Sequence, residues 1–246
     1  MRKLFATLLM AVALLPASAQ DDSELGMWLS AAGQKKINKQ WNVTAEAEYR
    51  LRENLGSTDR WTVSLGTAYK PVKWLKLDAG YKFMRVLNDD KSTMKTDGVS
   101  LYRWAPAYWN TRHRLWASAT ATLPLGRLDL SLRERWQYTY RPSTTYERYD
   151  FDDDEWEDKT RKGAAKHVVR SRLMAEYDIR HCKVDPFASV ELYNAAGGLE
   201  KLRYTFGAEW KISKKQGLEF FYRYVDSHDD DETNLHVIGL GYKYKF

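Results

Sequence analysis

The chain has 246 residues, with 39 Lys and Arg against 33 Asp and Glu, and a formal net charge of +6. This mildly basic balance gives no support for a nucleic-acid partner, and the single cysteine, Cys182, excludes an intramolecular disulfide framework. Contacts other than disulfides must therefore hold the fold together.

The first predicted element is a secretion signal. Two basic residues precede an apolar run from Leu4 to Leu15, and the sequence ASA at 17–19 fits a small-x-small cleavage site. The run is shorter than the roughly 20 residues of a membrane-spanning helix. We therefore expect residues 1–19 to be a cleaved signal peptide. Residues 20–246 then form one domain, because no linker or break in composition follows.

The mature chain alternates between apolar and polar residues with a period of two. In WNVTAEAEYRLR (41–52) one face is apolar and the other carries charges of both signs, which is typical of a β-strand. The same alternation predicts strands at 61–69, 75–83, 115–123, 128–132, 173–179, 202–210, 218–224 and 238–246, with weaker ones at 25–34 and 184–194. Many are close to the 9 to 11 residues that a tilted strand needs to cross a bilayer.

The predicted connections alternate in length. PVKW (71–74), LPLG (123–126), RHCK (180–183) and SKKQ (213–216) are short, whereas 52–59, 87–110, 141–166, 194–200 and 226–233 are long and polar. Transmembrane barrels have short turns at one end and long loops at the other, and a Greek-key β-sandwich has no reason to keep this order. Aromatic residues at strand ends also favour membrane interfaces. We therefore predict an all-β, antiparallel transmembrane barrel rather than a secreted sandwich.

The number of strands stays open at this point, between roughly 10 and 12. Bacterial barrels usually have an even number, so the eleven candidates must lose or gain one. If residues 25–34 do not span, ten strands remain. If 96–104 (TDGVSLYRW) is a further strand, there are twelve. Loop lengths favour ten, because every long loop then lies at one end.

Several segments together resemble a known family, labelled domain of unknown function 2490. The resemblance is carried by RHRLWASATATLPLGRLDLSLRERWQY (112–138), VVRSRLMAEYDI (168–179), VELYN (190–194) and LRYTFGAEW (202–210). It covers nearly the whole mature chain and implies a bacterial outer-membrane barrel. It implies no activity.

The polar faces of the strands predict a charged lumen. The expected members of this network are Glu46, Glu48, Arg50, Arg133, Arg135, Arg170, Arg172, Glu176, Glu191, Arg203, Glu209, Glu219 and Arg223. These charges must pair or lie in water, because an isolated buried charge is costly. Two interpretations remain: a polar core that braces a small barrel, or a narrow passage whose arginines attract small anions.

Other features give weaker hypotheses. Glu134 shares the lipid-facing parity of Leu128, Leu130 and Leu132, so we expect a bulge or a position at the membrane interface there. The acidic segment 149–158 lacks the glycine of an EF-hand loop. We interpret this segment and 226–233 as solvated loops, with a weak divalent-cation site, or contact with cations bridging lipopolysaccharide, as the alternative. No metal or cofactor is expected.

An enzyme acting on lipid or lipopolysaccharide acyl chains is the alternative function. His113 and His167 have the outward parity that such a site would use, but no serine motif accompanies them, so no catalytic residue is predicted.

The chain ends GLGYKYKF, with Tyr242, Tyr244 and Phe246 on the apolar face. By resemblance to outer-membrane barrels, this strand is the expected signal for the barrel-insertion machinery. The other expected partner is outer-membrane lipid, the expected location is the cell outer membrane, and the solute stays unidentified.

Overall fold

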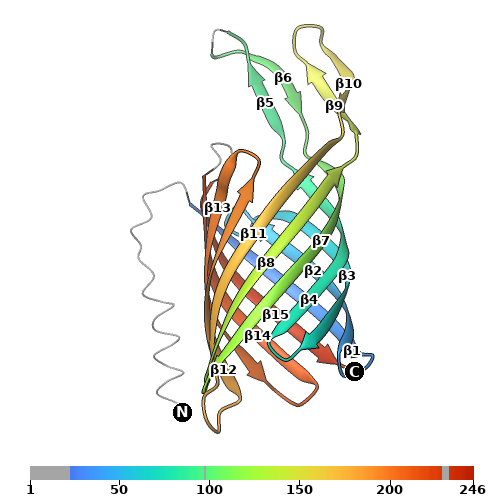
Figure 1. Cartoon of the computed structure of the whole chain (residues 1–246). Helices are drawn as coiled ribbons and strands as arrows, with labels where there is room; N and C mark the ends of the chain where they lie inside the picture. The colour runs from blue at the N-terminus through green and yellow to red at the C-terminus, as the bar shows by residue number, and fades with distance from the viewer. Residues whose placement is uncertain (1–22, 97, 229–232) are drawn as a thin grey trace.

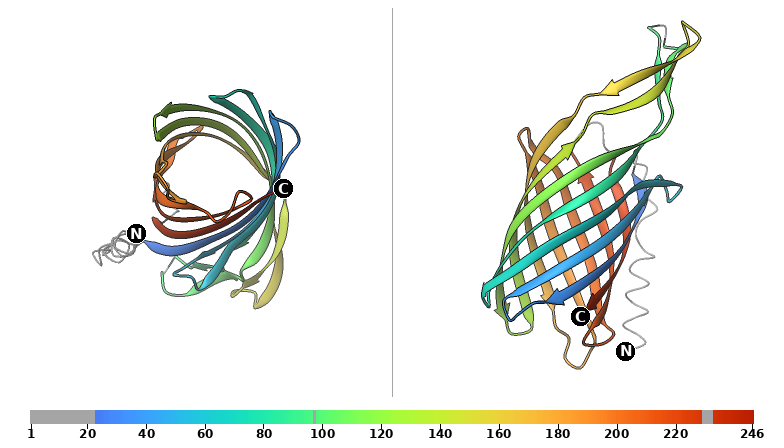
Figure 2. Two further views of the ribbon diagram at one scale, coloured as in Figure 1. Left: turned by 90° about the horizontal axis from the view of Figure 1, so that it is seen from below. Right: turned by 90° about the vertical axis from the view of Figure 1, so that its right-hand side faces the viewer.

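The computed structural model describes residues 23–96, 98–228 and 233–246, and the predicted signal 1–19 lies outside them. Eleven strands close into one barrel (Figure 1, Figure 2). They are β1 (Glu24–Lys36), β2 (Trp41–Arg52), β3 (Ser57–Val72), β4 (Leu75–Asn88), β7 (Tyr108–Leu125), β8 (Leu128–Arg141), β11 (Ala164–Tyr177), β12 (Val184–Ala195), β13 (Gly198–Lys211), β14 (Gln216–Ser227) and β15 (Leu235–Lys245). Among the described residues, no helix is long and apolar enough to cross a membrane.

The barrel closes through a parallel pair, β1 with β15. The register runs from Glu24 opposite Leu235 to Gln34 opposite Lys245, while the other edge of β1 pairs antiparallel with β2. Eleven strands fall within the predicted range of 10 to 12. The preference for ten strands is wrong, and so is the alternative of twelve. The weak segment 25–34 is a full barrel strand, because its backbone groups satisfy both neighbours although its side chains alternate poorly.

A four-stranded sheet projects beyond one end of the barrel (Figure 1, Figure 2). It consists of β5 (Lys91–Met94), β6 (Leu101–Ala105), β9 (Thr144–Asp150) and β10 (Glu155–Arg161). The predicted long connections 87–110 and 141–166 thus contain ordered hairpins, and 96–104 is not a barrel strand. We call the barrel end that carries this sheet the upper mouth, and the opposite end the lower mouth.

The two faces of the projecting sheet differ in chemistry. The rings of Trp104 and Tyr149 both pack against Trp156 on one face. On the other, Arg103 Nε donates to Asp150 Oδ2 at 2.8 Å. This hydrogen bond lowers the pKa of the Asp150 carboxyl below its ordinary value.

The acidic segment 149–158 is a tight hairpin within this sheet, because β9 and β10 pair with Glu155 opposite Asp150. In the second acidic segment, residues 229–232 lie outside the described part.

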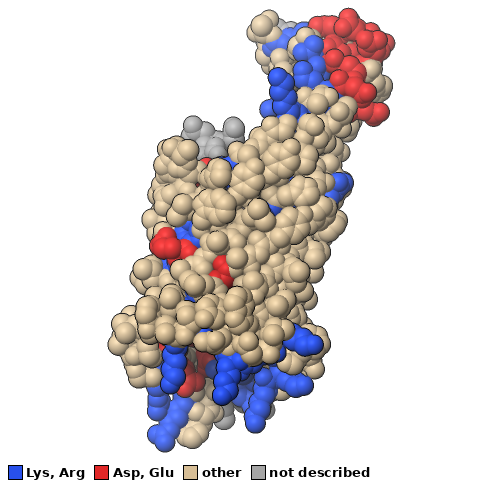
Figure 3. Space-filling model, turned by 45° about the vertical axis from the view of Figure 1, so that its right-hand side comes forward, with Lys and Arg blue, Asp and Glu red and all other residues tan. Residues whose placement is uncertain are grey.

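The outer wall of the barrel is apolar. Large side chains point away from the lumen and stay exposed, among them Leu65, Leu123, Leu173 and Phe206. Figure 3 shows a broad belt with few charges, with Lys and Arg gathered at the lower mouth and both signs on the projecting sheet. An exposed apolar belt between two charged ends is what a membrane-spanning barrel requires.

A small apolar core lies inside the lumen, against the closing strands. Trp28, Val225 and Val237 are buried together, and Phe221 packs against them. The ring of Phe221 occupies the space that a side chain on Gly239 would need. Glycine at 239 is therefore a packing requirement, since only a residue without Cβ lets the ring lie on the strand.

We expect Gly239→Ala to destabilise the barrel by about 1–3 kcal/mol, because the added Cβ forces the Phe221 ring out of its place. Gly197→Ala, in the β12–β13 turn, is the matched control, since no atom lies within 4 Å of its new Cβ. Urea unfolding of the detergent-folded protein measures both changes. Equal midpoints for the two variants would contradict this packing argument.

Glu134 lies in the middle of the lipid-facing row of β8, which runs from Leu128 to Tyr140. Pairing is continuous through Glu134 on both sides, opposite Ala119 and Ser171, so the expected bulge is wrong. Trp136 and Tyr138 follow Glu134 in the same row, so the other expectation, a position near the membrane interface, stays a prediction. Ser171 Oγ donates to Glu134 Oε2 at 2.7 Å, which gives the carboxyl group one partner.

We expect Glu134→Leu to stabilise the barrel by about 1 kcal/mol, less than the cost reported for a midplane Lys or Arg, because an apolar side chain replaces a carboxyl group facing lipid. Glu134→Gln keeps an acceptor for Ser171 and serves as the control. Unfolding midpoints in lipid bilayers would measure the difference. A destabilised Leu variant would show instead that the carboxyl group has a partner beyond Ser171.

Candidate functional site

The lumen contains a cavity of about 1280 Å³ that follows the length of β1. Its lining extends from Glu24 and Glu53, at the upper mouth, to Gln34 and Lys243, near the lower one. Among the described residues that line it, eighteen are Lys or Arg and nine are Asp or Glu. The cavity is therefore polar throughout and carries an excess of positive charge.

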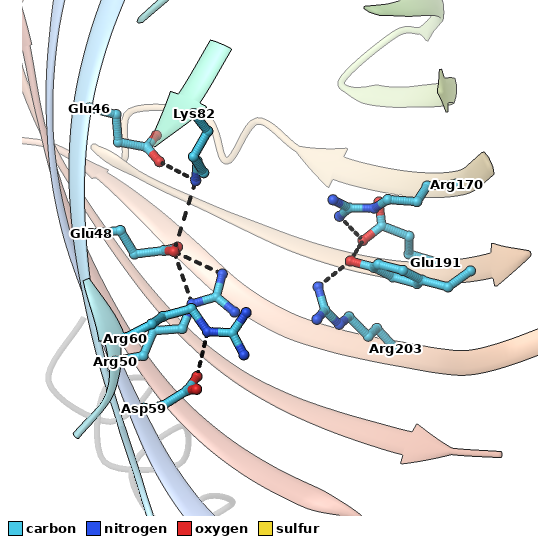
Figure 4. A network of polar contacts seen from close by, with 10 residues as sticks. Glu46, Glu48, Arg50, Asp59, Arg60, Lys82, Arg170, Glu191 and Arg203 are labelled. Atoms are coloured by element: carbon cyan, nitrogen blue, oxygen red, sulfur yellow. Dashed lines mark hydrogen bonds and ion pairs between the residues drawn. The ribbon is translucent and has the colours of Figure 1, made fainter. Parts of the chain in front are cut away.

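One wall carries a chain of alternating charges from β2, β3 and β4 (Figure 4). Glu48 Oε1 accepts a charged hydrogen bond from Arg50 at 2.8 Å, and Lys82 Nζ lies 3.9 Å from the same oxygen. Lys82 Nζ is also 3.6 Å from Glu46 Oε1. Arg60 Nε donates to Asp59 at 2.7 Å. Each carboxylate here has a cation within ion-pair distance, which offsets part of its desolvation.

A second network centres on Glu191, on the facing wall (Figure 4). This residue is 5% exposed. Its Oε2 accepts from Arg170 at 2.6 Å and from the Tyr193 hydroxyl at 3.1 Å, while Oε1 pairs with Arg133. Arg203 Nη1 in turn donates to the Tyr193 hydroxyl. One carboxylate thus connects three strands, β8, β11 and β12.

Aromatic rings hold several of these arginines in place. The guanidinium carbon of Arg50 is 3.6 Å from the centre of the Trp28 ring, and those of Arg223 and Arg203 are 4.7 and 5.2 Å from it. Cation–π contacts of this kind are stronger where water is excluded. Three positively charged side chains therefore contact the Trp28 ring at the barrel seam, where β1 pairs with β15.

The structure brings most of the predicted network together. Ten predicted charges line the cavity: Glu46, Glu48, Arg50, Arg133, Arg135, Arg170, Arg172, Glu191, Arg203 and Arg223. Three predicted charges do not line the cavity, although they point to the lumen side near the lower mouth: Glu176, Glu209 and Glu219. Glu209 is directly opposite Glu219 on β14 and Asp185 on β12. The site also includes residues that the prediction omitted, namely Trp28, Asp78, Lys82, Arg112, Arg114 and Tyr193.

The two outward-facing histidines contact aromatic side chains. The Tyr81 hydroxyl lies 2.7 Å from His113 Nδ1, and the ring of His167 packs against Trp136 and Tyr138. These contacts suit an aromatic belt. The described residues contain no group of three or more His, Cys, Asp or Glu side chains that could hold a metal ion.

The C-terminal residues complete the seam at the lower mouth. The Phe246 amide donates to the Gln34 carbonyl at 2.9 Å, and its ring lies over Gly33 of β1. The rings of Tyr244 and Phe246 meet edge to face at 4.8 Å. Tyr242 and Tyr244 continue the outward row of β15, as the alternation predicted.

A closed barrel with an apolar outer belt and a charged lumen defines a β-barrel of the outer-membrane type. The chain belongs to the family described as "Protein of unknown function (DUF2490)", whose model matches residues 25–236, so the predicted resemblance is confirmed. A search of curated proteins finds no match.

Two solved structures share the fold. The translocator domain of the autotransporter NalP from Neisseria meningitidis is 15% identical, with a TM-score of 0.61 over 87% of this chain and 77% of that one. The beta domain of the Bordetella autotransporter Brka is also 15% identical, with a TM-score of 0.57 over 84% and 83%. At this identity the likeness concerns the fold alone, and it confirms the predicted all-β barrel.

Proposed function

We propose that this protein is an outer-membrane barrel that forms a narrow, passive passage favouring anions. The observation that carries the proposal is the cavity, whose lining extends between the two mouths and bears twice as many cationic as acidic side chains among the described residues. An aqueous pore with fixed charges of one sign concentrates the opposite ions.

The barrel size supports a passage rather than a filled core. Side chains just fill a barrel of about eight strands. Eleven strands give a wider cross-section, and the paired charges of Glu48 and Glu191 lie along the walls without closing the cavity. We therefore favour the passage over the solid polar brace, while the networks still stabilise the wall.

Location and insertion form part of the same proposal. The two connections that contain β5–β6 and β9–β10 are long and both lie at the upper mouth, as in a barrel whose lower mouth faces the periplasm. The predicted long connections 52–59 and 194–200 are instead tight turns, at residues 53–56 and 196–197. The outward Tyr242, Tyr244 and Phe246 then present the terminal strand to the insertion machinery, and lipid covers the apolar belt. Since His113 and His167 contact aromatic rings, we propose a passive role rather than lipid hydrolysis.

Planar-bilayer recording of the folded protein tests the proposal. In a KCl gradient we expect discrete steps, with a reversal potential shifted toward that of chloride. A heat-modifiable gel shift must first establish that the sample is folded. Silent bilayers with a folded barrel, or a preference for potassium, would overturn the proposed passage. Release of fatty acid from phospholipid by the same sample would favour the enzyme instead.

A further inference from the structure

Five guanidinium groups gather at the upper mouth of the lumen. They come from β3, β7, β8 and β10, and all line the cavity: Arg60, Arg112, Arg114, Arg141 and Arg161. Two asparagines link Arg112 to Arg161: Asn88 Oδ1 accepts from Arg161 and from Asn110 Nδ2, and Asn110 Oδ1 accepts from Arg112. We call these five residues the arginine mouth.

Most hydrogen bonds of the arginine mouth go to uncharged acceptors. Arg112 Nε donates to Asn110 Oδ1 at 3.3 Å, and Arg114 Nε donates to Thr139 Oγ1 at 2.9 Å. Arg161 and Arg141 donate to Asn88 Oδ1 and to the Lys162 carbonyl, respectively. The carboxylate of Asp59 pairs with Arg60.

The arginine mouth also has a donor without a partner. In the described part of the chain, Arg141 Nη1 is buried and makes no hydrogen bond. A guanidinium group carries five N–H donors, and a buried donor left unpaired costs free energy. The arginine mouth therefore holds more donors than the described protein groups accept.

Deeper in the lumen, three arginines pair with carboxylates. Arg133 and Arg170 share Glu191, and Arg135 Nη2 lies 3.2 Å from Asp78 Oδ1. At the arginine mouth, Asn88, Asn110 and Thr139 supply neutral acceptors, while Asp59 pairs with Arg60. Unpaired Nε donors also occur on deeper arginines, for example Arg133 and Arg170. What distinguishes the arginine mouth is that, among the described residues, Asp59 is the one carboxylate that pairs with it.

We propose that the arginine mouth binds a multivalent oxyanion, a solute bearing phosphate or carboxylate groups, as it enters the passage. Carboxylate and phosphate groups each offer two oxygens to the paired N–H donors of a guanidinium fork, which a halide ion cannot do. Such a ligand relieves the repulsion among the five cations and satisfies Arg141 Nη1. This inference rests on the proposed passage and adds the class of solute and its first binding site.

Calorimetric titration of the folded full-length protein at low salt tests the site, with pyrophosphate and citrate as probes. We expect saturable binding of at least one probe by the wild type. Binding of pyrophosphate alone assigns the site to phosphate groups, binding of citrate alone to carboxylates, and binding of both to oxyanions in general. If neither pyrophosphate nor citrate binds, the proposed site is overturned.

Variants separate a site from a diffuse potential. Arg112→Gln with Arg114→Gln should weaken binding at least tenfold. The control, Lys76→Gln with Lys243→Gln, removes the same charge from the lower part of the same cavity and should keep the wild-type affinity. Equal losses in both double variants would overturn the site. Each variant must first show the heat-modifiable gel shift.

The outcome for the site is distinguishable from that for the passage. A barrel that conducts chloride but binds neither probe overturns the arginine mouth and leaves the passage standing. A barrel that binds a probe with the expected loss in the Arg112→Gln/Arg114→Gln variant, but does not conduct, supports the site and overturns the passage.

Discussion

Replacing Glu191 with alanine should destabilise the barrel by about 3–5 kcal/mol, because removing one partner of a buried ion pair leaves the other charge uncompensated. Here the loss is shared: Arg133, Arg170 and the Tyr193 hydroxyl would all lose their common acceptor. Chemical unfolding in detergent measures the effect. We also expect a stronger preference for anions in bilayers, since two guanidinium groups are released into the lumen.

Glu46→Ala is the matched control. The Glu46 side chain is 36% exposed, and its partner Lys82 retains Glu48 as a second carboxylate. Partly exposed pairs contribute about 0–1 kcal/mol, so the control should unfold close to wild type. Glu191→Gln separates charge from shape, because the amide can still accept from Tyr193. If Glu191→Ala unfolds like the Glu46→Ala control, the Glu191 network is not a brace for the wall.

Alternation along the sequence predicted the two faces of nearly every barrel strand. It works because successive side chains point to opposite sides, so parity alone separates the lumen from lipid. Ten predicted charges accordingly line the cavity. Their partners could not be predicted in the same way. The ion pair between Arg135 and Asp78 joins β8 to β4, and the contacts of Trp28 with Arg203 and Arg223 cross the seam.

The residues of the arginine mouth were missed for a specific reason. Arg112 and Arg114 have lumen parity, but the apolar row that marks their strand starts at Leu115. The strand itself begins at Tyr108, seven residues earlier. Above the apolar belt a barrel strand no longer needs lipid-facing hydrophobic residues, so the hydrophobic pattern ends before the hydrogen bonding does. The projecting sheet is hidden likewise, since β5 is the polar sequence KSTM.

Local sequence patterns did not predict which strand β15 pairs with to close the barrel. This pairing gives the second prediction with a large expected effect, a disulfide crosslink between β1 and β15. We expect Leu29→Cys with Leu240→Cys, in a Cys182→Ser background, to form a disulfide nearly quantitatively on oxidation. These residues are 211 positions apart in the sequence, but they are directly opposite in the β1–β15 pair and both face outward. Directly paired strand positions place their Cα atoms within the range that a disulfide spans.

Two further pairs make the result decisive. Phe220→Cys with Leu240→Cys joins β14 to β15 and should crosslink however the barrel closes. Leu29→Cys with Leu77→Cys places the two cysteines on β1 and β4, which are not neighbours, so this pair should not crosslink. In a ten-stranded barrel β15 would close on β2, and β1 would be left out. The Leu29–Leu240 pair would then stay reduced while the Phe220–Leu240 pair crosslinked.

The odd number of strands also makes the closing pair, β1 with β15, parallel. In a ten-stranded barrel closed by β2 and β15 the last pair would be antiparallel, which is slightly more stable per residue than a parallel one. The chain offsets this difference with contacts special to the seam: Trp28 packs against Val237 inside the lumen, and Phe246 covers Gly33 outside it. Deleting Phe246 should therefore weaken the Leu29–Leu240 crosslink while leaving the Phe220–Leu240 crosslink intact, since only the first depends on β1 staying against β15.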